Sequence, residues 1–325
     1  MDNDQTTIPI LKFPSASSTL ALGKEMCDKV REACESHGCF FLVHEDKIPS
    51  GLREEMFFNL KTLFDLPEET KNKYVSPKPY CSYFGKCPEV PSYESFGIDD
   101  APGLDVARAF ADLMWPEGNP NFCEALSSMG SNMMDVNLLV LRMILESLGM
   151  ERLYDSCVED TTVVFRLMKY KVPPTGYASA IGLLAHTDKN VLTILSQNEV
   201  QGLEVQTKAG HWVQANVPKD GFVVIVGDAL KAWSNGRLHA ARHRVVISGE
   251  KDRYSCGLFL VPKEEATIKV PQELVDQNHP LKYRPFVYSH FMSFFVSSTA
   301  STKLGDDDAP LEWGDLDALD LYAGI

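Results

Sequence analysis

Two histidines and an aspartate have the residue types and the spacing to bind one metal ion. His186 and Asp188 stand two positions apart in the run His186-Thr187-Asp188, and side chains at i and i+2 of an extended strand point to the same face. Two imidazoles and one carboxylate on one side of an octahedral ion form the facial triad of non-haem Fe(II) sites, which leaves positions open for other ligands. His-x-Asp also occurs by chance in exposed loops, so the tripeptide alone is a weak signal.

The third metal ligand has two candidates, His239 and His243. Both follow the turn signal Asn235-Gly236, but His243 begins a run with β-branched residues that predicts a strand. A ligand fixed on a strand is held more rigidly than one in a turn. We therefore predict His186, Asp188 and His243 as the metal ligands, with His239 as the alternative.

Arg253 and Ser255 form a second i, i+2 pair further along the chain. A guanidinium in a closed pocket binds a carboxylate through two parallel hydrogen bonds, and a neighbouring hydroxyl adds one more. Tyr170, on another predicted strand, has a phenolic hydroxyl that can donate to the same ligand. This set suits a dicarboxylate cosubstrate that reaches from the metal to the arginine. A surface ion pair is the alternative for Arg253 taken alone.

The elements that must position these residues change character near residue 155. Before it, apolar residues recur at helical spacing and predict helices over 20–37, 50–63 and 119–149, with a buried strand over 39–43. After it, short strands are separated by turn signals, over 163–170, 191–196, 203–207, 212–217, 223–227, 244–248 and 254–261. Helical patterns return over 285–298 and in a last segment that contains Trp313, Leu316 and Leu319.

These patterns predict an α+β chain with a mainly β core, a double-stranded β-helix (jelly roll) flanked by N-terminal and C-terminal helices. We divide it into an N-terminal helical region over 1–155, a jelly-roll core over 156–265 and a C-terminal helical tail over 266–325, packed as one unit. Residues 76–102 are rich in Pro, Tyr, Ser and Gly without periodicity. Such a stretch predicts a long connection that covers a substrate or is anchored to the core by its aromatic rings.

The composition narrows the possible partners. The chain has 325 residues, of which 44% are hydrophobic, and a formal net charge of −14, which argues against nucleic acid or an anionic membrane as partner. The acidic start, Met1-Asp2-Asn3-Asp4, is unlike a signal peptide, and no apolar run approaches the roughly 20 residues of a membrane span. The eight cysteines form no C-x-x-C pair. We expect a cytoplasmic monomer with reduced thiols and a small-molecule substrate.

In the predicted site residues and in the motifs around them, the chain resembles the plant 2-oxoglutarate/Fe(II)-dependent dioxygenases over nearly its whole length. The matching core motifs are His186-Thr187-Asp188, Gly202-Leu203-Glu204-Val205, Gly227-Asp228, Trp233-Ser234-Asn235-Gly236-Arg237, His243-Arg244-Val245 and Arg253-Tyr254-Ser255. Ser92-Tyr93-Glu94-Ser95-Phe96-Gly97 and the terminal Tyr322-Ala323-Gly324-Ile325 resemble a subgroup that includes glucosinolate side-chain dioxygenases, auxin-oxidising dioxygenases and the lignan ring-closing deoxypodophyllotoxin synthase.

The resemblance implies a role for each site residue. His186, Asp188 and His243 would bind Fe(II). Arg253, Ser255 and Tyr170 would bind 2-oxoglutarate, with O2 as the second cosubstrate and ascorbate as reductant in an assay. Many relatives have Asn two residues before the tyrosine, where this chain has Met168, so that contact to the cosubstrate is missing. Positions that line the substrate pocket of relatives match Tyr83, Phe259 and Val261.

The expected function is oxidation of a small, largely apolar plant metabolite or hormone by hydroxylation, desaturation or ring closure, coupled to conversion of 2-oxoglutarate to succinate and CO2. An auxin-type indole carboxylate is an alternative substrate, since Arg108 or Arg166 could bind its carboxylate. A jelly roll that binds metal and ligand without turnover is a second alternative. A zinc hydrolase is a third, but it needs a general base beside the metal and has no use for Arg253.

Overall fold

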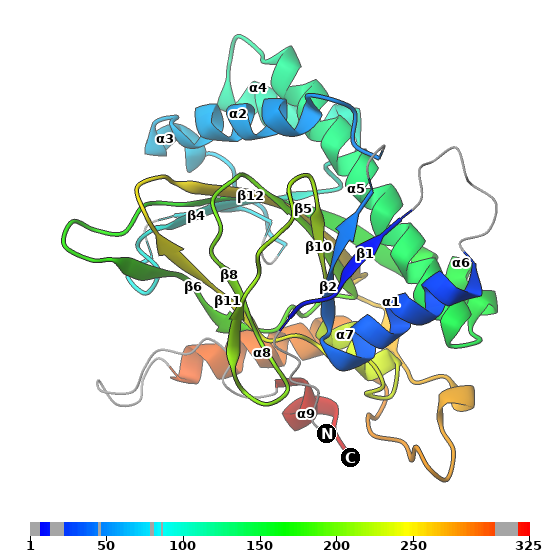
Figure 1. Cartoon of the computed structure of the whole chain (residues 1–325). Coiled ribbons are helices and arrows are strands. Elements are labelled where there is room, and N and C mark those ends of the chain that lie inside the picture. The colour runs from blue at the N-terminus through cyan, green and yellow to red at the C-terminus, as the bar shows by residue number, and fades with distance from the viewer. Residues whose placement is uncertain (1–6, 14–22, 45–46, 79–80, 86, 303–317) are drawn as a thin grey trace.

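The computed structural model describes residues 7–13, 23–44, 47–78, 81–85, 87–302 and 318–325, and in them the predicted jelly roll is present as two facing β-sheets (Figure 1). The large sheet has the strand order β1 (Ile10–Lys12), β2 (Cys39–Val43), β10 (Phe222–Val226), β7 (Leu192–Gln197), β12 (Arg253–Pro262), β5 (Thr161–Tyr170), β4 (Tyr93–Asp99) and β3 (Tyr83–Phe84). The small sheet has the order β6 (Ser179–His186), β11 (His243–Ser248), β8 (Leu203–Gln206) and β9 (Trp212–Gln214).

Helices cover the outer face of the large sheet. Figure 1 shows α2 (Leu52–Phe64), α4 (Leu104–Met114) and α5 (Pro120–Ser147) on this face, with α3 (Glu68–Lys71) beside α2 and with α1 (Lys24–Ser36) beside the strands that open the chain. The remaining short elements are α6 (Tyr154–Glu159), α7 (Asp228–Trp233), β13 (Thr267–Ile268), β14 (Phe286–Val287), α8 (Tyr288–Thr302) and α9 (Ala318–Ala323). None of the described helices has both the length and the apolar character needed to cross a membrane.

The central strands β2, β10 and β7 of the large sheet are buried on both faces, which explains their largely apolar sequences. On β5, Leu167 packs against the helices, whereas Met168 and Tyr170 belong to the core between the two sheets. This period of two separates a helix-covered outer face from an inner face that looks toward the small sheet. Val245 of the small sheet closes the same inner core.

The long helix α5 fixes the strands that carry the site. Asn119 caps it, since its side chain accepts a hydrogen bond from the backbone N–H of Phe122, and Pro120 occupies the first turn. Asn137, buried in the middle of the helix, donates to the carbonyls of Leu192 on β7 and Leu258 on β12, at 3.4 and 3.3 Å. An amide on the buried face of the helix therefore ties α5 to the two central strands.

The predicted elements match the structure except in a few places. Residues 76–102 are not one aperiodic connection, because Tyr93–Asp99 forms β4 and pairs along its length with β5. The strands β3, β4 and β6 and the helices α4 and α7 were not predicted, whereas the predicted buried strand 39–43 is present as β2. In the last predicted helix, Leu319 lies in α9, while Trp313 and Leu316 lie outside the described residues.

Candidate active site

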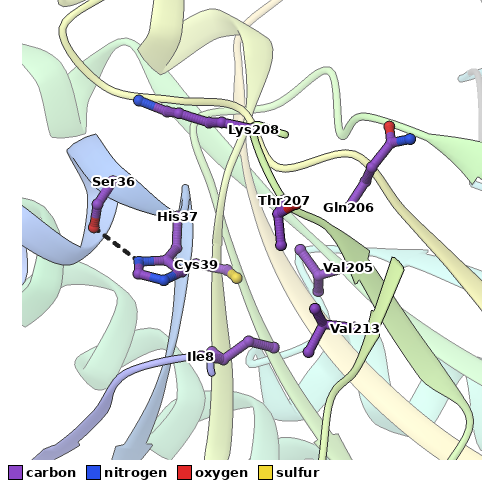
Figure 2. A pocket seen from close by; sticks show the side chains of 9 residues that line it. All are labelled: Ile8, Ser36, His37, Cys39, Val205, Gln206, Thr207, Lys208 and Val213. Carbon is purple, nitrogen blue, oxygen red and sulfur yellow. Dashed lines mark hydrogen bonds between the residues drawn. The ribbon is translucent and has the colours of Figure 1, made fainter. Parts of the chain in front are cut away.

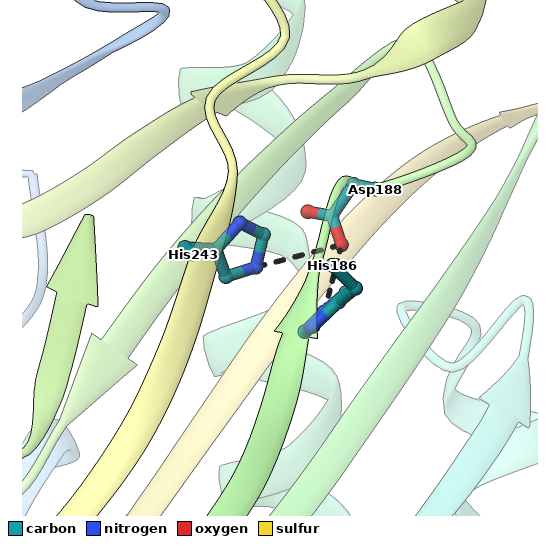
Figure 3. A group of neighbouring side chains, drawn as sticks. All are labelled: His186, Asp188 and His243. Atoms are coloured by element: carbon teal, nitrogen blue, oxygen red, sulfur yellow. Dashed lines mark ion pairs between the residues drawn. The ribbon is translucent and has the colours of Figure 1, made fainter. Parts of the chain in front are cut away.

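The structure brings His186, Asp188 and His243 together at the end of the small sheet (Figure 3). His186 is the last residue of β6 and His243 the first of β11, and the two are direct partners across the strand pair. Asp188 follows the end of β6, so the expectation that it shares a strand with His186 is corrected. The Nε2 atoms of both imidazoles lie 3.8 Å from Oδ1 of Asp188, and all three ligand atoms lie within 4.8 Å of one another. They face a common point, as one bound ion requires.

Hydrogen bonds outside the triad orient each ligand. Nδ1 of His186 lies 2.8 Å from the carbonyl of Leu184, and Nδ1 of His243 lies 2.9 Å from the carbonyl of Ala241. A carbonyl only accepts, so Nδ1 carries the proton of each neutral ring and the Nε2 lone pair points to the metal position.

The carboxylate of Asp188 is held in the same way. The hydroxyl of Thr193 donates to Oδ2 of Asp188 at 2.6 Å, which leaves Oδ1 toward the imidazoles. Burial, together with repulsion from His243, lowers the pKa of His186 to about 3. Burial alone would raise the pKa of Asp188, but His243, His186 and the Thr193 hydroxyl outweigh it and lower the pKa. A neutral His186 and an ionised Asp188 are the forms that bind a metal ion.

A second network, which the sequence analysis missed, fixes the turn that carries Asp188. Lys189 donates through Nζ to Oγ1 of Thr187 and to Oδ2 of Asp228, each at 2.7 Å. The backbone N–H of Asp228, at the start of α7, donates to the carbonyl of Asp188 at 2.8 Å. A lysine beside the His-x-Asp run and an acid directly after a buried strand were the signals available in the sequence.

His239, the alternative third ligand, lies apart from the triad. Its backbone N–H donates to the carbonyl of Cys34 at the end of α1. Burial lowers the pKa of its imidazole to about 4, with Lys208 and Lys231 acting in the same direction. The choice of His243 over His239 therefore agrees with the geometry.

Arg253 is a fully buried cation on the inner face of the large sheet, at 0% exposure. It donates to Oε1 of Gln197 at 2.9 Å and to the hydroxyl of Ser255 at 3.4 Å, and its guanidinium lies 4.9 Å from the centre of the Tyr170 ring. Within the described part of the chain no carboxylate pairs with it, and its Nε has no hydrogen-bond partner. Burial lowers its pKa. A buried guanidinium among neutral groups is costly unless an anion binds there.

The register of the large sheet places the arginine and the metal position along one surface. On β12 and β7, Ser255 is opposite Gln197 and Phe259 is opposite Thr193, the residue that binds Asp188. Arg253 and the triad therefore lie at two ends of the same inner face.

Tyr170 contributes its ring to this surface. The hydroxyl of Tyr170 donates to the sulfur of Met168 at 3.6 Å, so its predicted hydrogen bond to a cosubstrate stays a prediction. The ring itself lies against the Arg253 guanidinium on one side and packs against Tyr93, with ring centres 5.1 Å apart. Arg253, Ser255 and Tyr170 are thus brought together, as expected from the sequence.

The predicted substrate residues divide between the two faces. Phe259 lies on the inner face beside Thr193, and Val261 follows two residues later on that face, packed against the C-terminal helices. Tyr83 is not brought to the site. It pairs with Phe96 across β3 and β4 and so shares the outer, helix-covered face, with ring centres 4.9 Å apart.

The hydroxyl of Tyr83 belongs to a buried charge network around Glu94. It donates to Glu94, which also pairs with Lys71 and Lys171 at 2.5 and 2.8 Å. Burial alone would raise the pKa of Glu94, but these hydrogen bonds outweigh it and lower the pKa to about 2. The network holds β4 against α3 and has a structural role.

A pocket elsewhere in the molecule does not belong to this site. Figure 2 shows it between the end of α1, β2 and the β8–β9 edge, lined by apolar side chains such as Ile8, Val205 and Val213, with His37 and Lys208 at its border. None of the triad residues lines it.

A jelly roll that presents two histidines and one aspartate to a single metal position defines the class of non-haem Fe(II) oxygenases. Residues 154–262 match the model of the 2OG-Fe(II) oxygenase superfamily, and residues 8–98 match the model described as non-haem dioxygenase in morphine synthesis N-terminal. The chain belongs to the 2-oxoglutarate/Fe(II)-dependent oxygenase family. It is an oxidoreductase, a plant-type dioxygenase that uses Fe(II) and 2-oxoglutarate.

Curated relatives agree with the predicted subgroup. The probable 2-oxoglutarate-dependent dioxygenase AOP1.2 of Arabidopsis thaliana is 40% identical over 297 residues, which cover 89% of this chain and 90% of the relative. The 2-oxoglutarate-dependent dioxygenase AOP2 of the same plant is 27% identical over 412 residues, covering 89% and 94% of the two chains.

Solved structures show the same similarity. The crystal structure of the rice dioxygenase for auxin oxidation superposes with a TM-score of 0.77 at 32% identity and covers 90% of this chain and 96% of the rice chain. The 2-oxoglutarate complex of the Arabidopsis thaliana dioxygenase for auxin oxidation 1 gives a TM-score of 0.76 at 27% identity and covers 84% and 100%.

Proposed function

We propose that this dioxygenase oxidises a small, largely apolar plant metabolite or hormone, by hydroxylation, desaturation or ring closure, while 2-oxoglutarate is converted to succinate and CO2. In this proposal His186, Asp188 and His243 hold the iron, and Arg253 and Ser255 bind the distal carboxylate of 2-oxoglutarate beside Tyr170. The observation that supports it most is the pairing of the converged triad with a fully buried arginine that has no acidic partner among the described residues.

Bound Fe(II) supplies the redox chemistry through which O2 and 2-oxoglutarate oxidise a substrate C–H bond. The protein residues prepare that centre. The two Nδ1–H bonds and the Thr193 hydroxyl keep the ligand atoms aimed at one point before the ion binds, so little reorganisation is needed.

We propose that small and apolar groups line the path of 2-oxoglutarate between Arg253 and the metal position. A Cβ placed on Gly257 would lie 3.2 Å from Leu195 Cδ1 and 3.6 Å from Met168 Cε, so these two side chains converge over the glycine. We propose that this narrow apolar surface lies beneath the chain of 2-oxoglutarate and excludes water from it. Exclusion of water strengthens the ion pair with Arg253.

The apolar substrate is supported by Phe259 and Val261, which are partly exposed on the inner face. A second candidate is an indole carboxylate of the auxin type, favoured by the 32% identity to the rice enzyme named for auxin oxidation. We also propose a cytoplasmic monomer, and the net charge of −14 argues against nucleic acid or an anionic membrane as partner.

Aerobic incubation with Fe(II), ascorbate and labelled 2-oxoglutarate, with and without a panel of apolar acids and alcohols, tests the proposal. We expect succinate formation that requires Fe(II), is lost in His243→Ala and is retained in the matched control His239→Ala. Binding of metal and 2-oxoglutarate without succinate under every condition would identify a binding protein instead of an oxygenase.

A further inference from the structure

A second arginine, Arg166, lies on the inner face of the large sheet. Measured along the strands, it is closer to the metal position than Arg253 is. Arg166 shares the inner face of β5 with Met168 and Tyr170, because side chains two residues apart alternate to the same side. Across the strand pair Arg253 is opposite Tyr170, whereas Arg166 is opposite Gly257. The face therefore carries two guanidinium groups at different levels of one strand pair.

The contacts of Arg166 place its guanidinium beside an aromatic ring. Nη2 donates to the hydroxyls of Tyr93 and Ser95 at 3.2 and 3.1 Å, and the group lies 6.0 Å from the centre of the Phe259 ring. Phe259 is directly opposite Thr193, whose hydroxyl binds Asp188. A short series of contacts thus leads from Arg166 through one ring to a metal ligand.

The two arginines differ in how far their side chains are exposed to solvent. Arg253 is fully buried, as suits a closed pocket for a small dicarboxylate, whereas Arg166 and Phe259 are only partly buried. A Cβ on Gly257 would also lie 3.0 Å from the Phe259 ring, so this glycine leaves room for the ring beside Arg166. A cation and an apolar ring, both reachable from outside, form the two halves of a site for an organic acid.

Two other charged groups, Arg108 and Asp99, do not fit the role. Arg108, the other arginine considered for a carboxylate, is exposed on α4 and pairs with Asp105 at 3.2 Å. Asp99, the acid at the end of β4 on the same face as Arg166, is paired with Lys78. Nη2 of Arg166 uses its two N–H groups on the Tyr93 and Ser95 hydroxyls, so we expect the N–H groups of Nη1 to meet a carboxylate.

We propose that Arg166 binds a carboxylate of the substrate, with Tyr93 and Ser95 orienting its guanidinium, and that the apolar body of the substrate lies on Phe259. The substrate class is then an organic acid with one anionic group at one end. This assignment rests on the proposed function, because it describes the substrate of that same centre.

The test compares apolar acids with their neutral amides in the native Fe(II)-loaded protein. The probes are indole-3-acetic acid, phenylacetic acid and decanoic acid, each with its amide, and the readout is succinate formed from labelled 2-oxoglutarate above the level without probe. A charge-assisted pair inside a protein predicts that at least one acid stimulates turnover about 10- to 100-fold more than its amide. This comparison needs no variant, so misfolding does not affect it.

Two substitutions then locate the preference. Arg166→Gln should reduce the acid-over-amide ratio at least about tenfold, and Arg166→Lys, which keeps the charge but loses the planar guanidinium that Tyr93 and Ser95 orient, should give an intermediate ratio. Arg108→Gln is the matched control and should leave the ratio unchanged. An unchanged ratio in Arg166→Gln, amides as effective as acids, or no stimulation by any acid would each overturn the assignment. Failure of the Mn(II)-loaded native protein to bind 2-oxoglutarate would instead remove the proposed function, and this subsite with it.

Discussion

Replacement of Arg253 by methionine tests the proposed cosubstrate site most directly. The guanidinium is fully buried, donates to Gln197 and Ser255, and lies on the ring of Tyr170. Methionine fills a similar volume without charge. If Arg253 binds the distal carboxylate of 2-oxoglutarate, the substitution leaves that carboxylate buried and unpaired.

The expected effects on binding and on stability have different sizes. Removing one partner of a desolvated ion pair costs about 3–5 kcal/mol, which corresponds to a rise of about two to three and a half powers of ten in the Kd for 2-oxoglutarate. The unliganded protein loses a costly buried charge and leaves two neutral acceptors without a donor, at about 1–3 kcal/mol each. These terms oppose one another, so we expect the free energy of unfolding without 2-oxoglutarate to change by less than about 2 kcal/mol.

Calorimetric titration of 2-oxoglutarate into the Mn(II)-loaded protein measures the first quantity, and urea unfolding measures the second. In the native protein, 2-oxoglutarate at 100 times its Kd should add about 2.7 kcal/mol to the unfolding free energy, and this gain should vanish in Arg253→Met at the same concentration. Arg244→Met is the control, because Arg244 pairs with Glu204 at the outer side of β11. A Kd in Arg253→Met within about threefold of native would refute the assigned role of Arg253.

Three further predictions concern the metal position and the scaffold. His243→Ala should abolish binding of Fe(II) or Co(II) measured by metal titration, while His239→Ala should bind normally, and the reverse pattern would exchange the two assignments. Thr193→Val, which removes the hydroxyl on Asp188, should weaken metal affinity about 10- to 100-fold, whereas equal affinity would show that the hydroxyl does not orient the carboxylate. Because the folded-state pKa of Glu94 is about 2 and the unfolded value is 4.5, its contribution of about 3 kcal/mol is present above pH 4.5 and is lost as the pH falls through 2. Glu94→Gln should therefore lower the free energy of unfolding at pH 7 and make it fall less as the pH is lowered, as measured by urea unfolding from pH 7 to 3. The same pH dependence as in the native protein would contradict this.

The core of the site could be predicted from the sequence because its chemistry demands particular residues at fixed spacing. The triad needs an i, i+2 pair and one more imidazole on a neighbouring strand, and the β-branched run after His243 distinguished that residue from His239. The i, i+2 spacing of a strand likewise predicted that Arg253 and Ser255 share one face of the sheet. The strands around them were legible since each is a short apolar run bounded by turn residues.

β4 could not be recognised in this way. Its sequence from Tyr93 to Asp99 contains two acids, a serine and a glycine, which is the composition of a loop. It is nonetheless a buried strand because Glu94 is neutralised by two lysines that lie far apart in the sequence, Lys71 and Lys171. The misplacement of Tyr83 has the same origin, since only the pairing of β3 with β4 determines which face its ring occupies.

For the two arginines considered for a substrate carboxylate, the periodicity of the strand or helix alone would have been enough to tell them apart. Arg166 stands four residues before Tyr170 on one strand, so once Tyr170 is assigned to the inner face, Arg166 must share that face. Arg108 stands three residues after Asp105 on a helix, the spacing of an ordinary surface ion pair. What the sequence could not supply was Phe259 beside Arg166, because that neighbour depends on the register of β12 against β5 and on the absence of a side chain at Gly257. A change at Gly257 is therefore expected to alter substrate choice without touching either arginine, since even a methyl group there displaces the ring that we assign to the substrate body.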